Sequence, residues 1–300
     1  MKLTRIWVSG LVLTLAWVNV AAAKERPAPP RLPAGVKVVQ DLPYVEGGHE
    51  RNRLDLYLPE KAEGRLPLVV WIHGGAWAMG SKDGCPAVLL TAKGYAVASI
   101  NYRLSQHAIF PAQIEDCKAA VRWLRANAAK YHIDADHIGV WGASAGGHLV
   151  AMLGTTGDVK ELEGKGGNLD QSSRVQCVVD WFGPTDFVSW DPNFNKAVYS
   201  MIARLLGGPV QENKEKARKA SPLTYVDKDS APFLIMHGDQ DTLVPLRQSD
   251  VLAEALKKAG VEVKLVVVQG NGHGGPGFGS PENRKLIADF FATHLGKGNP

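Results

Sequence analysis

"HIGVWGASAGGHLVAML" (residues 137–153) is the stretch that decides the fold of this 300-residue chain. Its first five residues form an apolar run typical of a buried strand, and the run from residue 146 is typical of a helix. Between them stands G-x-S-x-G, centred on Ser144. Small residues on either side allow a sharp strand–turn–helix connection. We therefore expect a strained backbone at Ser144, rather than an incidental serine in a glycine-rich turn, and a free N–H on Ala145 at a helix N-terminus.

Further apolar runs, each ending in glycine or polar residues, follow the same rhythm. Such runs favour strands buried on both faces of a mostly parallel sheet, and they are "LPLVVWIHGG", "YAVASINYRL", "VQCVVDWFGPTD", "APFLIMHGDQD" and "VEVKLVVVQGNGH". "RLDLYLP" alternates with period two and predicts a half-exposed strand. Helical patterns lie between them at residues 111–131, 248–260 and 281–296. The alternation predicts an α/β fold with one doubly wound sheet of about eight strands.

The domain organisation follows from the segments that lie outside this alternation of predicted strands and helices. Residues 24–37 are proline-rich and predict an extended lead-in, so that residues 38–300 form a single domain. Residues 154–173 are glycine-rich and predict a surface loop. Residues 187–226 are long enough to hold helices, and we expect them to form a small cap over the carboxyl edge of the sheet, where open α/β sheets bind ligands.

The N-terminus has the pattern of an export signal. Lys2 and Arg5 precede an apolar run that ends in three alanines, so cleavage is expected after Ala23. The alternative, an uncleaved anchor, is disfavoured because a spanning helix needs roughly 20 apolar residues. We therefore expect an exported protein, periplasmic or extracellular, with residues 1–23 removed and no membrane attachment.

Charge and cysteine content limit the partners. Removal of residues 1–23 takes away two cations and no acid, so that the net charge falls from +4 to +2. That balance argues against nucleic acid as a partner. The three cysteines, Cys85, Cys117 and Cys177, lack C-x-x-C spacing; one pair could form a disulfide, but sequence separation does not decide it. The oligomeric state is equally open.

"HGGAW" (residues 73–77) directly follows a predicted strand. Its glycines leave backbone N–H groups uncovered, so Gly75 and Ala76 can donate to an oxyanion. His73 could act as a general base, but we favour a structural role in which it braces the glycine loop.

"GNGHGG" (residues 270–275) follows the last strong strand, and its histidine can reach a serine on a neighbouring strand. The alternative is a solvated loop histidine. "HGDQD" (residues 237–241) contributes His237, Asp239 and Asp241 between the serine and His273. A metal site there would need further ligands, and the calcium-loop spacing is missing. We expect neither a metal nor a cofactor.

These motifs resemble the α/β-hydrolase esterases with an HGG-type oxyanion loop, and among them the secreted bacterial carbohydrate esterases that include feruloyl and acetyl xylan esterases. The resemblance extends from about residue 38 to the C-terminus, through "INYRLS", "FGPTD" and "SPLTYV" as well as the motifs above. It implies a catalytic triad of Ser144, Asp241 and His273 and an oxyanion hole from Gly75, Ala76 and Ala145. Where the hormone-sensitive-lipase-like members have a third glycine this chain has Ala76, whose methyl group narrows the hole without removing its N–H.

Given this resemblance, the other two titratable side chains of "HGDQD", Asp239 and His237, are expected to have structural roles. Asp239 is expected to hold its own turn, and His237 to end the strand and brace the loop. Five aromatic side chains near the expected site could stack on an acyl group or a sugar, although core packing is an equal alternative for each. They are Trp77, Trp181, Phe182, Phe187 and Trp190.

The resulting hypothesis is a secreted serine ester hydrolase acting on acetyl or feruloyl esters of carbohydrates, with a small molecule or a polysaccharide as substrate. A formamidase of the kynurenine formamidase type shares "HGGxW" and the triad, but its substrate fits an export signal poorly. A hydrolase-fold binding protein without activity is a further alternative, disfavoured because such a protein would usually lack one triad residue.

Overall fold

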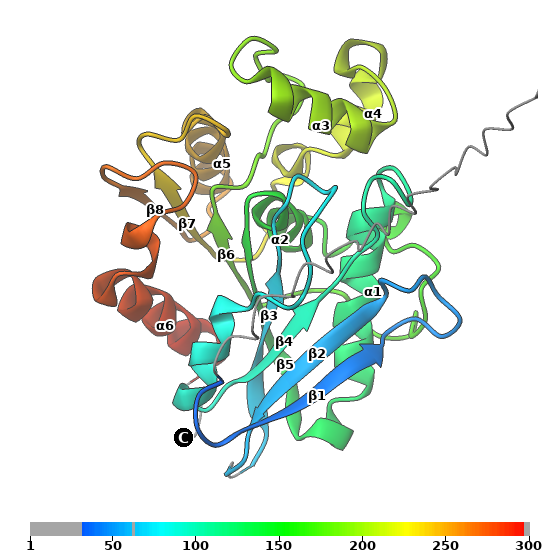
Figure 1. Ribbon diagram of the computed structural model, residues 1–300, viewed down its shortest axis with the longest axis vertical. Helices are drawn as coiled ribbons and strands as arrows, with labels where there is room; N and C mark the ends of the chain where they lie inside the picture. Colours follow the sequence, from blue (N-terminus) through cyan, green and yellow to red (C-terminus); the bar gives the residue numbers. More distant parts are fainter. Residues whose placement is uncertain (1–31, 62–63, 297–300) are drawn as a thin grey trace, which may run out of the picture. The chain divides into compact units, whose positions relative to one another are not determined.

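An eight-stranded sheet organises the part of the chain that the computed structural model describes, residues 32–61 and 64–296 (Figure 1). The strand order is β1-β2-β4-β3-β5-β6-β7-β8. β1 and β2 run antiparallel to their neighbours, and all later pairs are parallel. The bounds are β1 Val36–Pro43, β2 Arg53–Pro59, β3 Leu66–Ile72, β4 Ala96–Ile100, β5 Ile133–Ala143, β6 Cys177–Trp181, β7 Phe233–Gly238 and β8 Val263–Val268. The predicted doubly wound, mostly parallel sheet is confirmed.

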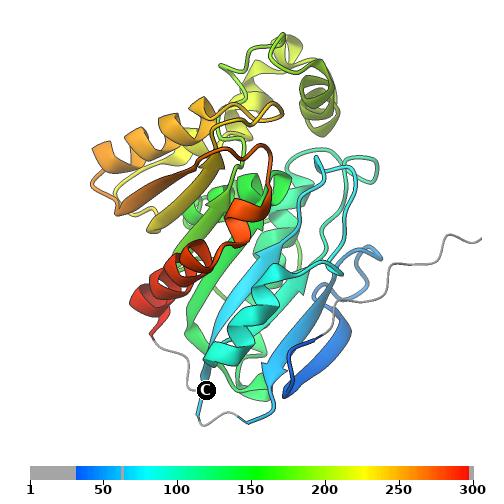
Figure 2. The same ribbon diagram turned by 60° about the vertical axis from the view of Figure 1, so that its left-hand side comes forward.

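Helices cover both faces of this sheet, and Figure 2 shows α6, in red, along one of them. One apolar core lies between the sheet and α1, α2 and α5, and a second lies between the sheet, α6 and the 3-10 helix η1. The bounds are α1 Ala112–Ala126, α2 Ala145–Thr155, α5 Arg247–Lys258, α6 Pro281–Leu295 and η1 Pro86–Lys93. The shorter 3-10 helices are η2 Ala129–Tyr131, η3 Lys160–Leu162, η4 Val210–Glu212, η5 Pro222–Tyr225 and η6 Pro276–Gly279.

β3 shows why a central strand reads as a continuous apolar run. All of its residues are buried. Leu68 and Val70 point into the core beneath α1 and α2, whereas Val69 and Trp71 point into the core beneath α6 and η1. Successive side chains of a strand face opposite sides, so a sheet covered on both faces requires apolar residues at every position.

Two strands differ from their predicted exposure. Residues 54–57 of β2 are buried rather than half-exposed, because β1 pairs with β2 on the outer side and leaves β2 inside the sheet. The polar residue of its alternating pattern, Asp55, is 2% exposed and pairs with Lys82 Nζ at 2.8 Å. β8 was expected to be buried, but it forms the edge of the sheet and residues 263–267 are half-buried or exposed.

The predicted signal peptide, residues 1–23, and residues 24–31 of the predicted lead-in lie outside the described residues. β1 begins at Val36, within the last residues of that lead-in. No helix in the described part of the chain is long and apolar enough to cross a membrane. Cys85, Cys117 and Cys177 are buried free thiols. The disulfide that one pair of them could have formed is therefore absent from the described residues.

The insertion at residues 187–226 contains α3 Lys196–Leu206 and α4 Lys214–Lys219. In Figure 1 both helices lie beyond the carboxyl ends of the parallel strands, above α2. Asn195 accepts hydrogen bonds from the first N–H groups of α3 and donates from Nδ2 to Thr242 O at 3.0 Å. Phe187 N donates to Ser221 Oγ at 2.9 Å, which closes the base of the insertion.

Residues 154–155 of the predicted surface loop belong to α2, and the remainder of residues 154–173 is held to α1 by polar contacts, among which Glu163 supplies the carboxylate. Glu163 accepts from Lys118 Nζ at 2.6 Å, from Ser173 Oγ at 2.6 Å and from Arg122 Nη1. The Lys118 and Arg122 side chains are 0% and 1% exposed. Burial opposes ionisation of Glu163, but the bonds from Lys118 and Ser173 outweigh it and lower the pKa of the carboxyl.

Glu163→Gln should lower the free energy of unfolding by about 3 kcal/mol, because it leaves two buried cations without their counter-charge. Since the pKa of Glu163 lies below its ordinary 4.5 in the fold, this stabilisation is complete above that pH and is lost as the carboxylate protonates at lower pH. Denaturant unfolding at pH 7 and pH 3.5 measures both effects. Glu215→Gln, which breaks the exposed pair with Arg218, is the control and should leave the free energy of unfolding unchanged within error, because solvent screens an exposed pair. Equal losses in the two variants would refute the anchoring role of Glu163.

Candidate functional site

Ser144 stands in the connection between β5 and α2. Its φ of 57° and ψ of −119° lie in a region that non-glycine residues rarely occupy, as the motif predicts. Gly146 explains why the motif requires a small residue: a Cβ there would stand 2.0 Å from Ile72 O of β3. The first turn of α2 therefore packs directly against the backbone of the neighbouring strand.

A continuous hydrogen-bonded chain links the three side chains that the resemblance implies. Ser144 Oγ lies 2.8 Å from His273 Nε2, and His273 Nδ1 lies 2.7 Å from Asp241 Oδ2. The residues follow three strands of the parallel part of the sheet: Ser144 follows β5, Asp241 follows β7 and His273 follows β8, with β6 between the first two strands. Since the carboxyl ends of parallel strands meet at one edge, the topology brings together residues far apart in sequence.

The Asp241 carboxylate is buried, and both of its oxygens have partners. Oδ1 accepts from Leu243 N at 2.8 Å and Val244 N at 2.9 Å. Oδ2 accepts from His273 and lies 3.2 Å from His237 Nε2. Burial alone would raise the pKa of Asp241, but the bonds from His237 and His273 dominate and hold it well below its usual range. The carboxylate is therefore charged where it meets the His273 imidazole.

His237 braces this turn, as predicted. Its ring is fully buried, with Nε2 2.9 Å from Val244 O and Nδ1 2.7 Å from Ser249 Oγ. A carbonyl only accepts, so Nε2 carries the proton and Nδ1 accepts from the serine hydroxyl.

The prediction for Asp239 is wrong in its detail. Asp239 Oδ1 does not hold its own turn but accepts from Gly270 N, 31 residues further on, at 2.7 Å. Asp241 makes the local bonds instead. The physical reason is the close packing of the two loops: a Cβ on Gly238 would stand 2.2 Å from Asn271 O. Asp239 therefore ties the end of β7 to the loop that carries His273.

The glycine loop after β3 lies against the nucleophile turn, since a Cβ on Gly74 would stand 3.2 Å from Ser144 Cβ. Gly75 and Ala76 have left-handed φ values of 107° and 51°. Within the described residues, the N–H groups of Gly75 and Ala76 have no hydrogen-bond acceptor. Ala145 is the first residue of α2, where helix N–H groups also lack intrahelical partners. All three predicted oxyanion donors are therefore available to a ligand.

Three of the five predicted substrate-binding aromatic residues are core residues. Trp77, Phe187 and Trp190 are 2%, 0% and 5% exposed and belong to one apolar cluster. Trp77 Nε1 donates to His148 Nδ1 at 3.1 Å, and the Phe187 ring meets Trp77 edge-on at 5.7 Å. For these three side chains the structure favours the core-packing alternative, because the insertion folds back onto α2.

The remaining two aromatic residues lie at the end of β6. Phe182 is 6% exposed, and its ring centroid is 4.5 Å from that of His273, so it supports the imidazole. Trp181 is half-buried and donates to Met236 Sδ at 3.3 Å. Neither presents a wide free face to solvent.

Sequence reasoning missed several residues of the site. His148 lies four residues after Ser144 on α2 and links Trp77 to Ala220 O in the insertion, at 2.7 Å from its Nε2; the i,i+4 spacing is the signal that could have revealed it. Arg51, which contacts His73, belongs to no motif. Phe194 and Leu243 are 41% and 39% exposed and flank the contact between Asn195 and Thr242, so they offer apolar surface beside the Asp241 turn.

One surface group has the composition of a metal site. His49, Glu50 and His107 each place a potential ligand atom within 4.8 Å of the others. However, His49 Nδ1 accepts from Arg51 N at 3.1 Å, and His107 Nδ1 accepts from Leu104 N at 3.3 Å. A neutral ring that accepts at Nδ1 carries its proton on Nε2, so neither ring offers a lone pair to a cation in this arrangement. The group fits a polar surface contact better than a metal site.

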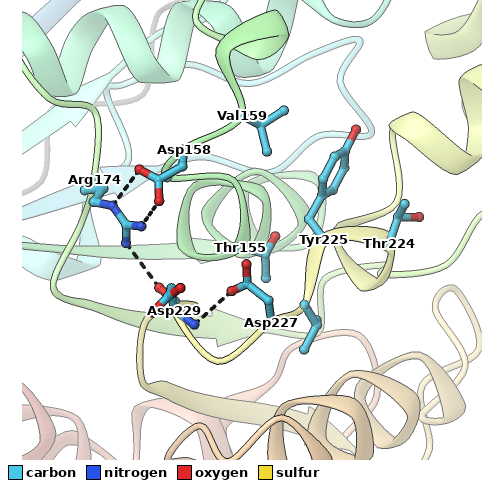
Figure 3. Close-up of a pocket in the computed structure, with 10 residues that line it drawn as sticks. Thr155, Asp158, Val159, Arg174, Thr224, Tyr225, Asp227 and Asp229 are labelled. Atoms are coloured by element: carbon cyan, nitrogen blue, oxygen red, sulfur yellow. Dashed lines mark hydrogen bonds and ion pairs between the residues drawn. The ribbon is translucent and has the colours of Figure 1, made fainter.

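A cavity of about 320 Å³ lies at the opposite edge of the sheet (Figure 3). Arg174 and Asp229, which line it, precede β6 and β7, whereas Ser144 follows β5. Its polar groups bind one another: Arg174 Nε donates to Asp158 at 3.0 Å, and Arg174 Nη1 donates to Asp229 O at 3.1 Å. The cavity has no uncommitted nucleophile or acid–base pair, so we place the candidate active site at Ser144.

A doubly wound sheet with a strained serine turn, an acid and a histidine at the carboxyl edge defines an α/β hydrolase. The chain belongs to the BD-FAE family, which it matches over residues 54–256. It is also similar to the esterase LipQ of Mycobacterium tuberculosis, with 30% identity over 262 residues, covering 85% of this chain and 61% of that protein. The chain spans only 51% and 65% of two further esterase relatives from the same organism.

Solved structures give the same class. A truncated carbohydrate esterase from gut microbiota is 36% identical with a TM-score of 0.80, covering 87% of this chain and 97% of that chain. An acetyl ester-xyloside bifunctional hydrolase from Caldicellulosiruptor lactoaceticus is 28% identical with a TM-score of 0.69, covering 82% of this chain and 89% of that chain. These relatives are named as esterases or ester hydrolases, and this chain shares the α/β-hydrolase fold with them.

Mutation of the two aspartates of "HGDQD" should have different effects on the reactivity of Ser144. Asp241→Asn should slow covalent labelling of Ser144 by a fluorophosphonate about 10⁴-fold, because the amide holds the wrong tautomer of His273. Asp239→Asn is the matched control and should change the rate less than about tenfold, since an amide oxygen still accepts from Gly270 N. Stopped-flow labelling of both folded variants measures the difference. A larger loss in Asp239→Asn would overturn the assignment.

Proposed function

We propose that the protein is an exported serine hydrolase that cleaves carboxylic esters of carbohydrates. Ser144 Oγ attacks the ester carbonyl while His273 Nε2 takes its proton, and the Asp241 carboxylate stabilises the imidazolium. The single observation that carries the proposal is the hydrogen-bonded chain from Ser144 through His273 to Asp241, with distances of 2.8 and 2.7 Å.

The remaining steps use the same groups. The N–H groups of Gly75, Ala76 and Ala145 stabilise the tetrahedral oxyanion, and the imidazolium returns its proton to the alcohol as the ester C–O bond breaks. Water, activated by His273, then attacks the acyl-Ser144 ester, and the acid leaves with the serine hydroxyl restored. Each donor of this kind contributes roughly 10²–10³ to the rate in comparable sites.

For the acyl group, the arrangement favours acetyl over feruloyl. Stacking on a feruloyl ring needs an exposed aromatic face, but Trp77, Phe187 and Trp190 are at most 5% exposed. The structural relative named as an acetyl ester-xyloside hydrolase supports an acetyl group, and the one named as a carbohydrate esterase supports an ester of a carbohydrate. Phe194, 41% exposed beside the Asp241 turn, is the exposed aromatic side chain on which a feruloyl ring could stack, so that stacking would fall to this one side chain and to the half-buried Trp181.

The proposal predicts an order of substrates. The purified protein should release acetate from acetylated xylan and hydrolyse p-nitrophenyl acetate at least about tenfold faster, in kcat/KM, than methyl ferulate, N-formylkynurenine or long-chain p-nitrophenyl esters. Ser144→Ala should reduce every activity to background with an unchanged circular dichroism spectrum, since the residual rate from binding alone is small. Preference for N-formylkynurenine would instead indicate the formamidase alternative. Failure of the wild type to react with both the panel and a fluorophosphonate would indicate a binding protein.

The proposal of export rests on residues 1–23, whose basic start, apolar run and terminal alanines have the pattern of a cleaved signal. Expression of the full chain in a Gram-negative host should give a mature protein outside the cytoplasm that begins at Lys24. N-terminal sequencing of fractionated cells measures this. An intact N-terminus in the membrane fraction would refute cleavage.

A further inference from the structure

We propose that Arg51 is a positioning residue for the oxyanion hole: it holds His73 in the tautomer that turns the N–H of the Gly74–Gly75 peptide toward Ser144. The inference rests on the proposed ester hydrolysis and adds to it a residue that belongs to none of the motifs. Arg51 comes from the segment between β1 and β2 and acts through His73 without touching the reacting atoms.

The His73 ring has a defined tautomer. The residue is 5% exposed, and its Nδ1 lies 2.7 Å from Gly74 O. A carbonyl only accepts, so Nδ1 carries the proton and Nε2 presents a lone pair. Burial lowers the pKa of His73 to about 4, and the charge of Arg51 lowers it too, against the opposing effect of the Gly74 carbonyl. The ring is therefore neutral near pH 7.

Arg51 completes this arrangement from the other side of the ring. Its Nη2 lies 3.2 Å from His73 Nε2. Because a guanidinium only donates, the contact requires Nε2 to accept and so selects the same tautomer. The same group donates to Gly80 O at 2.9 Å and to Tyr102 O at 2.8 Å. The planar guanidinium of Arg51 thus binds both His73 and Gly80, the two ends of the loop at residues 73–80. The ammonium group of a lysine cannot reproduce this planar set of donors.

The Gly74–Gly75 peptide plane transmits the position of the His73 ring to the oxyanion hole. In a trans peptide the C=O and N–H point in opposite directions. When His73 holds Gly74 O on one side, the Gly75 N–H must point to the other. Gly75, Ala76 and Trp77 follow with φ values of 107°, 51° and 55°. For Ala76 and Trp77 these conformations are strained, and strained conformations persist only where the surroundings over-determine them; Arg51 is part of that constraint.

The test compares Arg51→Met with Arg53→Met. Arg51→Met should lower the acylation rate constant for p-nitrophenyl acetate about 10- to 100-fold with KM changed less than about twofold, because an oxyanion donor acts in the transition state. Affinity for an acetyl-mimicking trifluoromethyl ketone, which binds as an oxyanion, should fall by the same factor. Arg53→Met loses the same charge two residues away, where Arg53 Nη1 donates to Asp41 O at 2.9 Å, and should match the wild type within about twofold.

A readout independent of activity tests the tautomer. In ¹⁵N-histidine-labelled protein, with His73 assigned from the spectrum of His73→Gln, the wild type should show a protonated Nδ1. Arg51→Met should show a mixture of both tautomers. An unchanged tautomer would overturn the proposal even if the rate fell, since the loss would then reflect a general effect on the fold.

The outcomes separate this inference from the function on which it rests. A wild type without hydrolysis or fluorophosphonate labelling refutes the function. An active wild type with unchanged rate, ketone affinity and tautomer in Arg51→Met refutes only the positioning role. If Arg51→Met does not fold, Arg51→Gln, whose shorter amide cannot reach both His73 and Gly80, is measured in the same way and judged by the same outcomes.

Discussion

The contact between the first turn of α2 and the backbone of β3 is the constraint on which the candidate site depends. A Cβ at Gly146 would stand 2.0 Å from Ile72 O, so the helix can approach the strand only because that residue has no side chain. The close approach forces the tight turn that holds Ser144 at a φ of 57°. It also sets the nucleophile beside the loop that follows β3, where the free N–H groups lie.

Polar contacts then stabilise the loops around this turn. The buried Asp241 carboxylate accepts from two backbone N–H groups and pairs with His273, the buried His237 ring pairs with Val244 and Ser249, and the half-buried Arg51 binds His73 and two carbonyls. An unmatched buried polar group costs about 1–3 kcal/mol, so each alternative loop conformation that breaks one of these contacts is disfavoured. The loops are therefore held by polar partners together with buried apolar side chains such as Trp77 and Val244.

The regular elements were predictable from sequence because their signal is local. Continuous apolar runs predicted β3 to β7, and proline and glycine marked the ends of α6. The exposure of β2 and β8 was not predictable, since it depends on which strand lies at the sheet edge. The same limit applies to Trp77 and Phe187: an aromatic residue near a motif has the same sequence signal whether it faces solvent or a core that forms only when the insertion folds back.

The sequence by itself determined the strand–turn–helix around Ser144, the order of serine, acid and histidine, and the mostly parallel sheet, because each follows from neighbouring residues or from chain order. Only the tertiary structure decided that Asp239 binds the His273 loop while Asp241 holds its own turn, and that Arg51 reaches His73. The contacts of Asp239 and Arg51 join segments far apart in the chain. Their partners depend on distances and directions across the folded sheet, which no local pattern encodes.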